Sequence, residues 1–122
     1  MPRFVILLHE MPAGHERGSH FDLMLEVGSV LRTWSHFEMP SKEKVVRLES
    51  LADHRPAYLD YEGPVSDNRG TVSRVDEGMY EAVEETESLL QYRLNGKLLT
   101  GLLSLKRDEN LPNSWTAAFS PE

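Results

Sequence analysis

The amino-acid sequence predicts a mainly β protein that folds as a compact antiparallel β-barrel with short helical turns. Apolar and polar residues alternate with a period of two in many segments, whereas the 3.6-residue period of a helix is weak almost throughout. Turn signals containing Gly, Pro or Asn separate these segments at short intervals, which is typical of barrels and sandwiches. The length of 122 residues, 39% of them hydrophobic, suits one domain over residues 1–122.

The segments with strand alternation follow one another along the chain. They cover residues 3–8, 19–27, 30–37, 45–51, 70–75, 79–83, 89–94, 97–106 and 114–119. Gly28-Ser29 and Asn95-Gly96 predict tight hairpin turns, the latter of type I′. Ser41 is the expected cap of a helical turn over 41–44, and Gly63-Pro64 marks a further turn. The acidic run 81–87 predicts a solvated loop or a short helix.

Composition restricts the location and the chemistry. No apolar run approaches the ~20 residues that span a bilayer, and residues 1–8 lack the basic region and cleavage site of a secretion signal. We therefore expect a cytoplasmic protein without membrane contact. The chain contains no cysteine, so any metal ion must bind to His, Asp or Glu.

The charge balance limits how the protein could meet nucleic acid. There are 13 basic and 20 acidic residues, which give a net charge of −7. Non-specific binding to DNA or RNA requires Lys and Arg to neutralise phosphates. We expect any such contact to be local, at a strand end or a loop, or to depend on a partner protein that delivers the nucleic acid.

The strongest local motif is His20-Phe21-Asp22. On a strand, residues two apart point to the same side, so the imidazole of His20 and the carboxylate of Asp22 converge. His9, at the end of the first strand, could supply a third ligand. Two His and one Asp with open positions suit Mn²⁺, Zn²⁺ or Fe²⁺. The alternative is that these are ordinary polar residues on a solvated strand face.

Asp53-His54 and Tyr58 form a second constellation. His54 could donate to a phosphate oxygen or transfer a proton near neutral pH, and Tyr58 could hold the same anion. The alternative is a turn, with Asp53 as a cap, His54 exposed and Tyr58 packed as a barrel aromatic. The residues alone leave both interpretations open.

The order of these motifs along nearly the full chain resembles the 3′-phosphoesterase module of bacterial and archaeal ATP-dependent DNA ligase D. The residues that carry the resemblance are Phe4-Val5-Ile6, His9, His20 to Glu26, Gly28, Leu31, Trp34, Pro40-Ser41, Asp53-His54, Tyr58, Asp60 to Gly63, Gly70-Thr71-Val72, Asp76, Gly78, Tyr80, Asn95 to Leu98, Gly101 and Lys106-Arg107. Each piece is common, and the specificity comes from their ordered agreement.

The resemblance implies a compact β-barrel with a site that favours Mn²⁺, with Zn²⁺ as the second expected ion. That family repairs the 3′ ends of DNA by removing a terminal phosphate or a ribonucleoside. By resemblance, His9, His20 and Asp22 match the metal ligands. His54 and Tyr58 match the residues that engage the scissile phosphate.

The sequence departs from the family pattern in ways that bear on activity. The family strand reads His-Tyr-Asp-Phe-Arg-Leu-Glu, and its phosphate-clamping arginine is replaced here by Met24. A family lysine is replaced by Glu38 and a glutamate by Ala52, while the loop between the first two ligands is longer and the loop before Gly70 is shorter. Arg17, three residues before His20, is the expected substitute for the lost arginine. Arg55 and Arg69 also lie near matched positions.

These observations support three hypotheses. The first is a divergent metal-dependent phosphoesterase that acts on nucleic-acid 3′ ends or small phosphate esters, with His54, Tyr58 and Arg17 as catalytic residues. The second is a non-catalytic relative that binds a metal ion or a phosphorylated end. The third is a structural barrel with a decayed site. We expect a monomer, with a DNA-repair protein as a conceivable partner.

Overall fold

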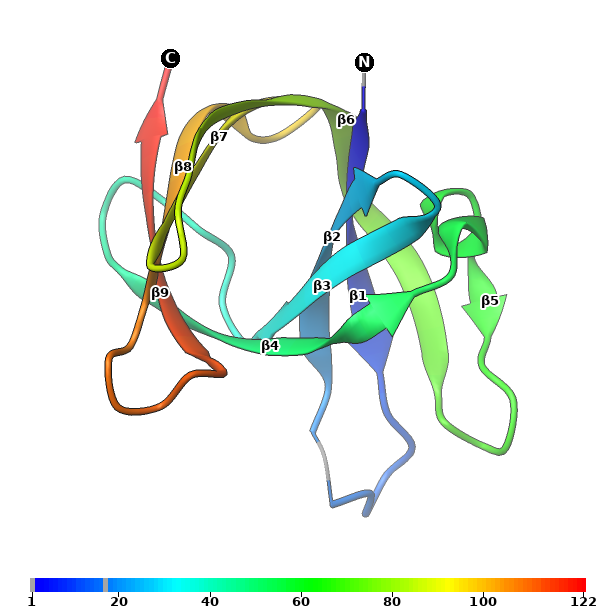
Figure 1. Ribbon diagram of the computed structural model, residues 1–122. Coiled ribbons are helices and arrows are strands. Elements are labelled where there is room, and N and C mark those ends of the chain that lie inside the picture. Colours follow the sequence, from blue (N-terminus) through cyan, green and yellow to red (C-terminus); the bar gives the residue numbers. More distant parts are fainter. Residues whose placement is uncertain (1, 17) are drawn as a thin grey trace.

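The computed structural model describes residues 2–16 and 18–122, which form a closed antiparallel barrel (Figure 1). Its strands are β1 (Arg3–Glu10), β2 (His20–Val27), β3 (Val30–His36), β4 (Val46–His54), β6 (Thr71–Glu85), β7 (Leu89–Gly96), β8 (Thr100–Arg107) and β9 (Ser114–Pro121). The neighbours run in the order β1-β2-β3-β4-β9-β8-β7-β6, and a pairing of β1 with β6 closes the ring. The predicted β-barrel is thus confirmed.

Two short elements lie outside the ring. The 3₁₀ helix η1 (Pro56–Leu59) and the two-residue strand β5 (Gly63–Pro64) connect β4 to β6, and β5 pairs with the start of β6. Figure 1 shows both elements at the side of the barrel, next to β1 and β6. No helix in the described part of the chain is long and apolar enough to cross a membrane.

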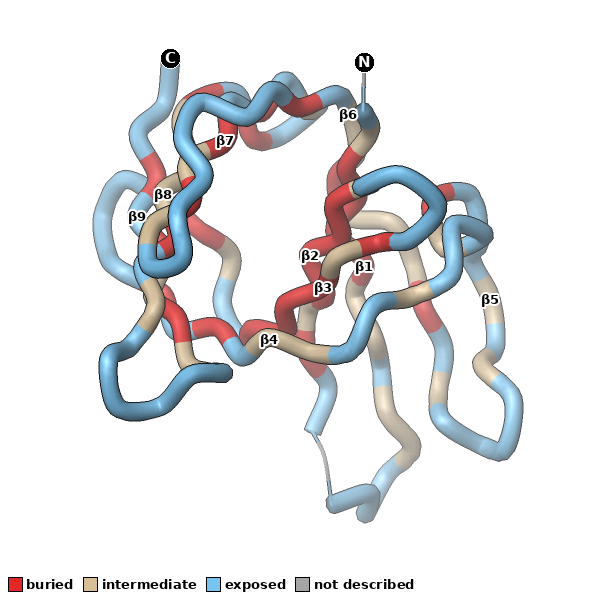
Figure 2. The backbone as a smooth tube through the Cα atoms, viewed as in Figure 1, coloured by how far each residue is buried: buried red, intermediate tan, exposed pale blue. Residues whose placement is uncertain are grey.

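Some of the barrel strands bury side chains on both of their faces. One face of all eight strands contributes to a large cluster that includes Phe4, Leu23 and Trp34, and this cluster fills the interior. On β1 and β2 the opposite face forms a smaller outer cluster, defined by Val5, Leu7, Met24, Leu31, Leu59 and Val72. Figure 2 shows these buried residues concentrated in the strands, whereas the projecting hairpin loops are exposed. The first three strands are therefore buried on both sides.

A buried carboxylate organises the hairpin between β7 and β8. Asp76, 1% exposed, accepts hydrogen bonds from the backbone N–H groups of Lys97, Leu98 and Leu99 and from that of Glu77, at 2.8–3.0 Å. Gly96 packs closely on this carboxylate, because an added Cβ would lie 2.6 Å from Asp76 Oδ2. A side chain at this position would clash.

This carboxylate explains why the predicted turn at Asn95-Gly96 is wrong. Both residues belong to β7, and the turn is made by Lys97 and Leu98, with Gly96 N–H donating to Leu99 O at 2.9 Å. The Asn-Gly pair has a local preference for a type I′ turn. The three turn N–H groups that Asp76 binds, those of Lys97, Leu98 and Leu99, outweigh that preference.

Other local expectations also require correction. β6 joins the strands predicted over 70–75 and 79–83 into one strand and continues through Glu85, where a loop or helix was expected. The cause is its pairing with β7, in which Glu81 lies opposite Arg93 and Glu85 accepts a hydrogen bond from Tyr92. Residues 41–44 form a β-bridge around a tight turn in place of a helical turn. Gly63-Pro64, expected as a turn, is β5.

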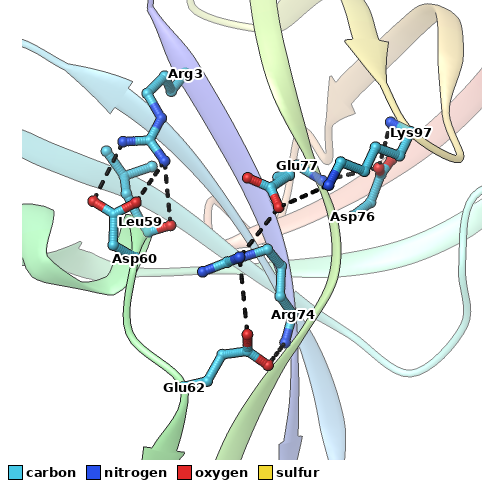
Figure 3. A network of polar contacts seen from close by, with 8 residues as sticks. All are labelled: Arg3, Leu59, Asp60, Glu62, Arg74, Asp76, Glu77 and Lys97. Carbon is cyan, nitrogen blue, oxygen red and sulfur yellow. Dashed lines mark hydrogen bonds and ion pairs between the residues drawn. The ribbon is translucent and has the colours of Figure 1, made fainter.

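A network of ion pairs fastens the η1–β5 segment to the barrel (Figure 3). Arg3 on β1 donates to Asp60 at 2.8 Å and to the Leu59 carbonyl at 3.5 Å. Arg74 on β6 lies 3.8 Å from the Glu62 carboxylate, which also accepts the Arg74 backbone N–H, and 3.2 Å from that of Glu77. These contacts fix the segment that carries Tyr58.

We predict that Asp76→Asn lowers the free energy of unfolding in urea by about 3 kcal/mol, because hydrogen bonds to a charged acceptor contribute about 1.5–3 kcal/mol each and the new amide NH₂ would face donors. Asp60→Asn is the control. Its side chain is 75% exposed, so we expect an unfolding midpoint close to that of the wild type. Equal midpoints for the two variants would contradict the structural role of Asp76.

The barrel interior also contains a buried histidine. His36 is 1% exposed, its Nδ1–H donates to Glu38 O at 2.7 Å, and its ring stacks on Phe21. Among the described residues, its buried Nε2 has no hydrogen-bond partner. Burial lowers the pKa of His36 below its usual value, although the hydrogen bond to the Glu38 carbonyl opposes this shift. The fold therefore favours the neutral ring.

We predict that His36 makes stability fall in mild acid. A lowered folded-state pKa means that its contribution is complete above about pH 6.5, the usual pKa of histidine, and is lost as the pH falls toward the folded-state value. Melting temperatures between pH 7.5 and 5 in EDTA should decline less steeply for His36→Leu than for the wild type. Parallel curves would show that another group carries the acid sensitivity.

Candidate metal centre

The pairing of β1 with β2 brings His9, His20 and Asp22 together. His9 lies directly opposite His20, and Leu7 lies opposite Asp22. Residues opposite one another in an antiparallel pair share a face, as do residues two apart on one strand. All three side chains therefore lie on the outer face of the barrel, on the same face as the outer cluster.

The three side chains converge closely enough to share an ion. One potential ligand atom from each residue can be chosen so that all three lie within 4.8 Å of one another. His9 Nδ1 is 3.7 Å from Asp22 Oδ2, and His20 Nε2 is 3.4 Å from Asp22 Oδ1. His20 and Asp22 are 2% and 3% exposed. The alternative of an ordinary solvated strand face is therefore wrong.

Backbone carbonyls orient both imidazoles. His20 Nδ1 lies 2.9 Å from Gly18 O, and His9 Nε2 lies 2.6 Å from Arg69 O. Because a carbonyl only accepts, each of these ring nitrogens carries the proton, and a neutral ring then presents a lone pair on its other nitrogen. Those other nitrogens, His9 Nδ1 and His20 Nε2, are the ones that face Asp22. Such hydrogen bonds commonly support histidines that bind metals.

The chemistry of the donor set fits a divalent cation. Asp22 Oδ1 is buried and has no hydrogen-bond partner among residues 2–16 and 18–122. Burying a carboxylate oxygen without a partner is costly, and a bound cation would compensate it. Two imidazole nitrogens and a carboxylate suit Mn²⁺, Fe²⁺ or Zn²⁺ and leave further positions for water or substrate.

His54 and Tyr58 form a second group on the same outer face. The turn interpretation is wrong for His54, which is the last residue of β4, partly buried, with Nδ1–H donating to Ala52 O at 2.9 Å. Its ring centre is 5.7 Å from that of Tyr58 on η1. Tyr58 packs against the outer cluster, which also contains Met24, the residue two positions beyond Asp22. The outer cluster thus links the two groups.

The structure shows the surroundings of Met24, Arg69 and Glu38, which bear on how the chain departs from the family pattern. Met24, which the resemblance matches to an arginine, is 1% exposed and packed in the outer cluster. Arg69 donates from its guanidinium to Ser66, so its contribution to the site is its backbone carbonyl. Glu38 forms an exposed ion pair with Lys44. Arg17 lies outside the described residues.

Several features of the site escaped the sequence reasoning. The carbonyls of Gly18 and Arg69 carry no signature in a sequence, because any residue supplies a carbonyl. The edge of the Phe37 ring approaches His20, with ring centres 6.5 Å apart. Alternation along residues 30–37 would have put Phe37 on the outer face with Ser35, so this neighbour could have been found.

A comparison with protein families identifies the family of this chain. A family model described as the DNA ligase D 3′-phosphoesterase domain matches residues 12–107, and no curated protein matches the sequence. The match contains His20, Asp22, His54 and Tyr58 and begins after His9, whose place in the site depends on the β1–β2 pairing alone. Since the match covers most of the chain, this protein belongs to the DNA ligase D 3′-phosphoesterase domain family.

Proposed function

We propose that this protein is a divergent divalent-metal-dependent phosphoesterase that removes a 3′-phosphate or a 3′-ribonucleoside from DNA ends. The convergence of His9, His20 and Asp22 within a family of 3′-phosphoesterases carries the proposal. Smaller phosphate esters are the second substrate class, because the acidic chain has few cations for a long duplex.

His9 Nδ1, His20 Nε2 and an Asp22 oxygen would hold the ion, with Mn²⁺ expected first and Zn²⁺ second. The ion would supply positive charge to a phosphoryl oxygen and acidify a water molecule. The protein's own residues supply the rest of the site. Gly18 O and Arg69 O keep each ring in the tautomer that presents a lone pair toward Asp22.

His54 and Tyr58 are the proposed phosphate-engaging pair. Because Nδ1–H of His54 is bound to Ala52 O, Nε2 is the nitrogen available to exchange a proton with substrate or to donate to a phosphate oxygen when protonated. The phenol O–H of Tyr58 is a second donor. The Arg3 and Arg74 ion pairs hold η1 in place and thereby restrict the position of Tyr58.

Arg17 is the proposed source of the positive charge that Met24 does not supply. It belongs to the segment that connects β1 to β2, and this segment leads directly to His20. A guanidinium donates bidentate, charge-assisted hydrogen bonds to phosphate, which methionine cannot replace. This assignment is separate from the metal centre and is tested separately below.

A second function, binding without cleavage, is favoured by one observation. Met24 is fully packed in the outer cluster at the position where the family has its arginine. A protein that retained the ligand triad and lost the phosphate clamp would still hold an ion and a phosphorylated end. Turnover that depends on added metal and disappears in Asp22→Asn would contradict this second function.

We predict that Mn²⁺ stabilises the folded protein and that Asp22→Asn abolishes this effect. When the free Mn²⁺ concentration is 100 times the Kd, binding at one site adds about 2.7 kcal/mol to the free energy of unfolding. Metal titrations followed by thermal unfolding check this, with Asp53→Asn, an exposed carboxylate, as the matched control. Affinity should weaken in acid, because imidazole must be neutral to bind. An Asp22→Asn variant that is stabilised as strongly as the wild type would exclude the triad.

We predict that the wild-type protein with Mn²⁺ releases phosphate from a 3′-phosphorylated DNA oligonucleotide. His54→Ala should lower kcat by about 10²-fold or more, as expected for loss of a general acid or base. Arg17→Ala should lower it by about 10²-fold, with Arg93→Ala, an exposed arginine on β7, as the control. Unchanged turnover in Arg17→Ala would eliminate that residue as the substitute arginine.

A further inference from the structure

An open groove lies next to the metal centre, on the outer surface of the barrel. It has a volume of about 890 Å³ and passes over β3 and β4 toward the residues that precede β9. Gly18, whose carbonyl orients His20, and Ser35, which pairs with Asp22, belong both to the groove wall and to the surroundings of the triad. A chain bound at the triad could therefore continue into this groove.

The wall of the groove next to the triad presents an aromatic ring. Phe37 is 68% exposed, and its ring contacts that of His20 edge-on. Leu111, 57% exposed, lines the same groove. Exposed aromatic rings beside a phosphate-processing site are suited to stacking on nucleobases, which every base permits because each has a flat π face.

The far end of the groove carries an arginine. Among the described residues that line it, Arg47 is the one cation, and it donates to Ser114 Oγ at 2.9 Å. A second hollow of about 400 Å³ shares Arg47 and Ser114 and adds two cations, Lys106 and Arg107, together with two carboxylates, Asp108 and Glu109. The two hollows therefore adjoin at Arg47 and Ser114.

The strand register explains how these cations come to lie in one row. Arg47 pairs with Thr116, and Thr116 pairs with Lys106. Their neighbours Leu48, Ala117 and Leu105 all point into the barrel interior, so the row itself points outward. The row runs from β4 over β9 to β8, away from the strands that carry the triad. Two strand spacings separate Arg47 from Lys106, about 10 Å.

We propose that this groove binds the unpaired strand that leads to the reacting 3′ end. Phe37 stacks on the base of the terminal nucleotide, and Arg47 and Lys106 contact successive backbone phosphates. One aromatic platform and one line of cations match a single strand. Glu16 and Glu49 also line the groove and would repel phosphates. The backbone phosphates therefore follow the Arg47–Lys106 row.

This inference rests on the proposed function and assigns its substrate class, a 3′-terminal single strand. The first test measures binding without catalysis, by fluorescence anisotropy with a labelled single-stranded oligonucleotide that ends in a 3′-hydroxyl. Phe37→Ala should weaken binding about tenfold, and Phe37→Trp should restore it. Arg47→Ala and Lys106→Ala should each reduce the slope of log affinity against log salt by about 0.7. Arg93→Ala should change neither quantity.

The second test uses turnover. Arg47→Ala and Lys106→Ala should each raise KM for a 3′-phosphorylated oligonucleotide about tenfold and leave the hydrolysis of p-nitrophenyl phosphate unchanged, because that ester is too small to reach them. Phe37→Ala should raise the KM for the oligonucleotide by a similar factor. Two results would overturn the groove assignment. One is unchanged oligonucleotide binding and unchanged KM in all three groove variants, and the other is a blunt duplex that binds as tightly as the single strand. A third outcome separates the two proposals. If the wild-type protein cleaves no phosphate ester but the groove variants still lose oligonucleotide binding, the groove assignment is supported and the proposed phosphoesterase activity is refuted.

Discussion

The site depends on the pairing of β1 along both of its edges. On one edge, β1 pairs with β2 and sets His9 opposite His20; on the other, it pairs with β6 and closes the barrel. A slip of one residue in either register would exchange the two faces of β1, because side chains alternate along a strand. His9 would then point into the apolar interior, and Phe4 and Ile6 would leave it. Such a slip would bury a polar imidazole among apolar side chains and exchange side chains of different volume between the two faces, so the same packing that stabilises the barrel also assembles the triad.

Two buried carboxylates show how burial by itself fails to distinguish structure from function. Asp76 accepts four backbone N–H groups, which satisfy its charge and fix the β7–β8 turn. Asp22 is buried to a similar extent, yet among the described residues its Oδ1 accepts no hydrogen bond, and two imidazoles oriented by carbonyls face it. A carboxylate with its hydrogen bonds complete is an element of the fold. A carboxylate that lacks hydrogen bonds and lies beside imidazole nitrogens with free lone pairs is suited to bind a cation.

Membership of the 3′-phosphoesterase family and the departures from its pattern have to be considered together. The packing of Met24 into the outer cluster adds apolar burial between the two polar groups of the outer face, at the cost of a phosphate donor. The ion pairs of Arg3 and Arg74 hold the η1–β5 segment against that cluster, so Tyr58 keeps its position without the arginine. The cations of the Arg47–Lys106 row lie farther from the triad. Phosphate recognition in this chain is therefore proposed to depend on loop and groove residues.

The sequence by itself determined the fold class, most strand positions, the tight turn at Gly28-Ser29 and the shared face of His20 and Asp22, because alternation and short turns are local properties. Only the tertiary structure decided the partner strands. The closure of β1 on β6, the shift of the Asn95-Gly96 turn and the continuation of β6 through Glu85 depend on residues far away in the chain. The same holds for the carbonyls of Gly18 and Arg69 and for the groove between Phe37 and Arg47. A backbone carbonyl or an open surface has no residue type of its own, so it acquires a role only when folding brings its neighbours together.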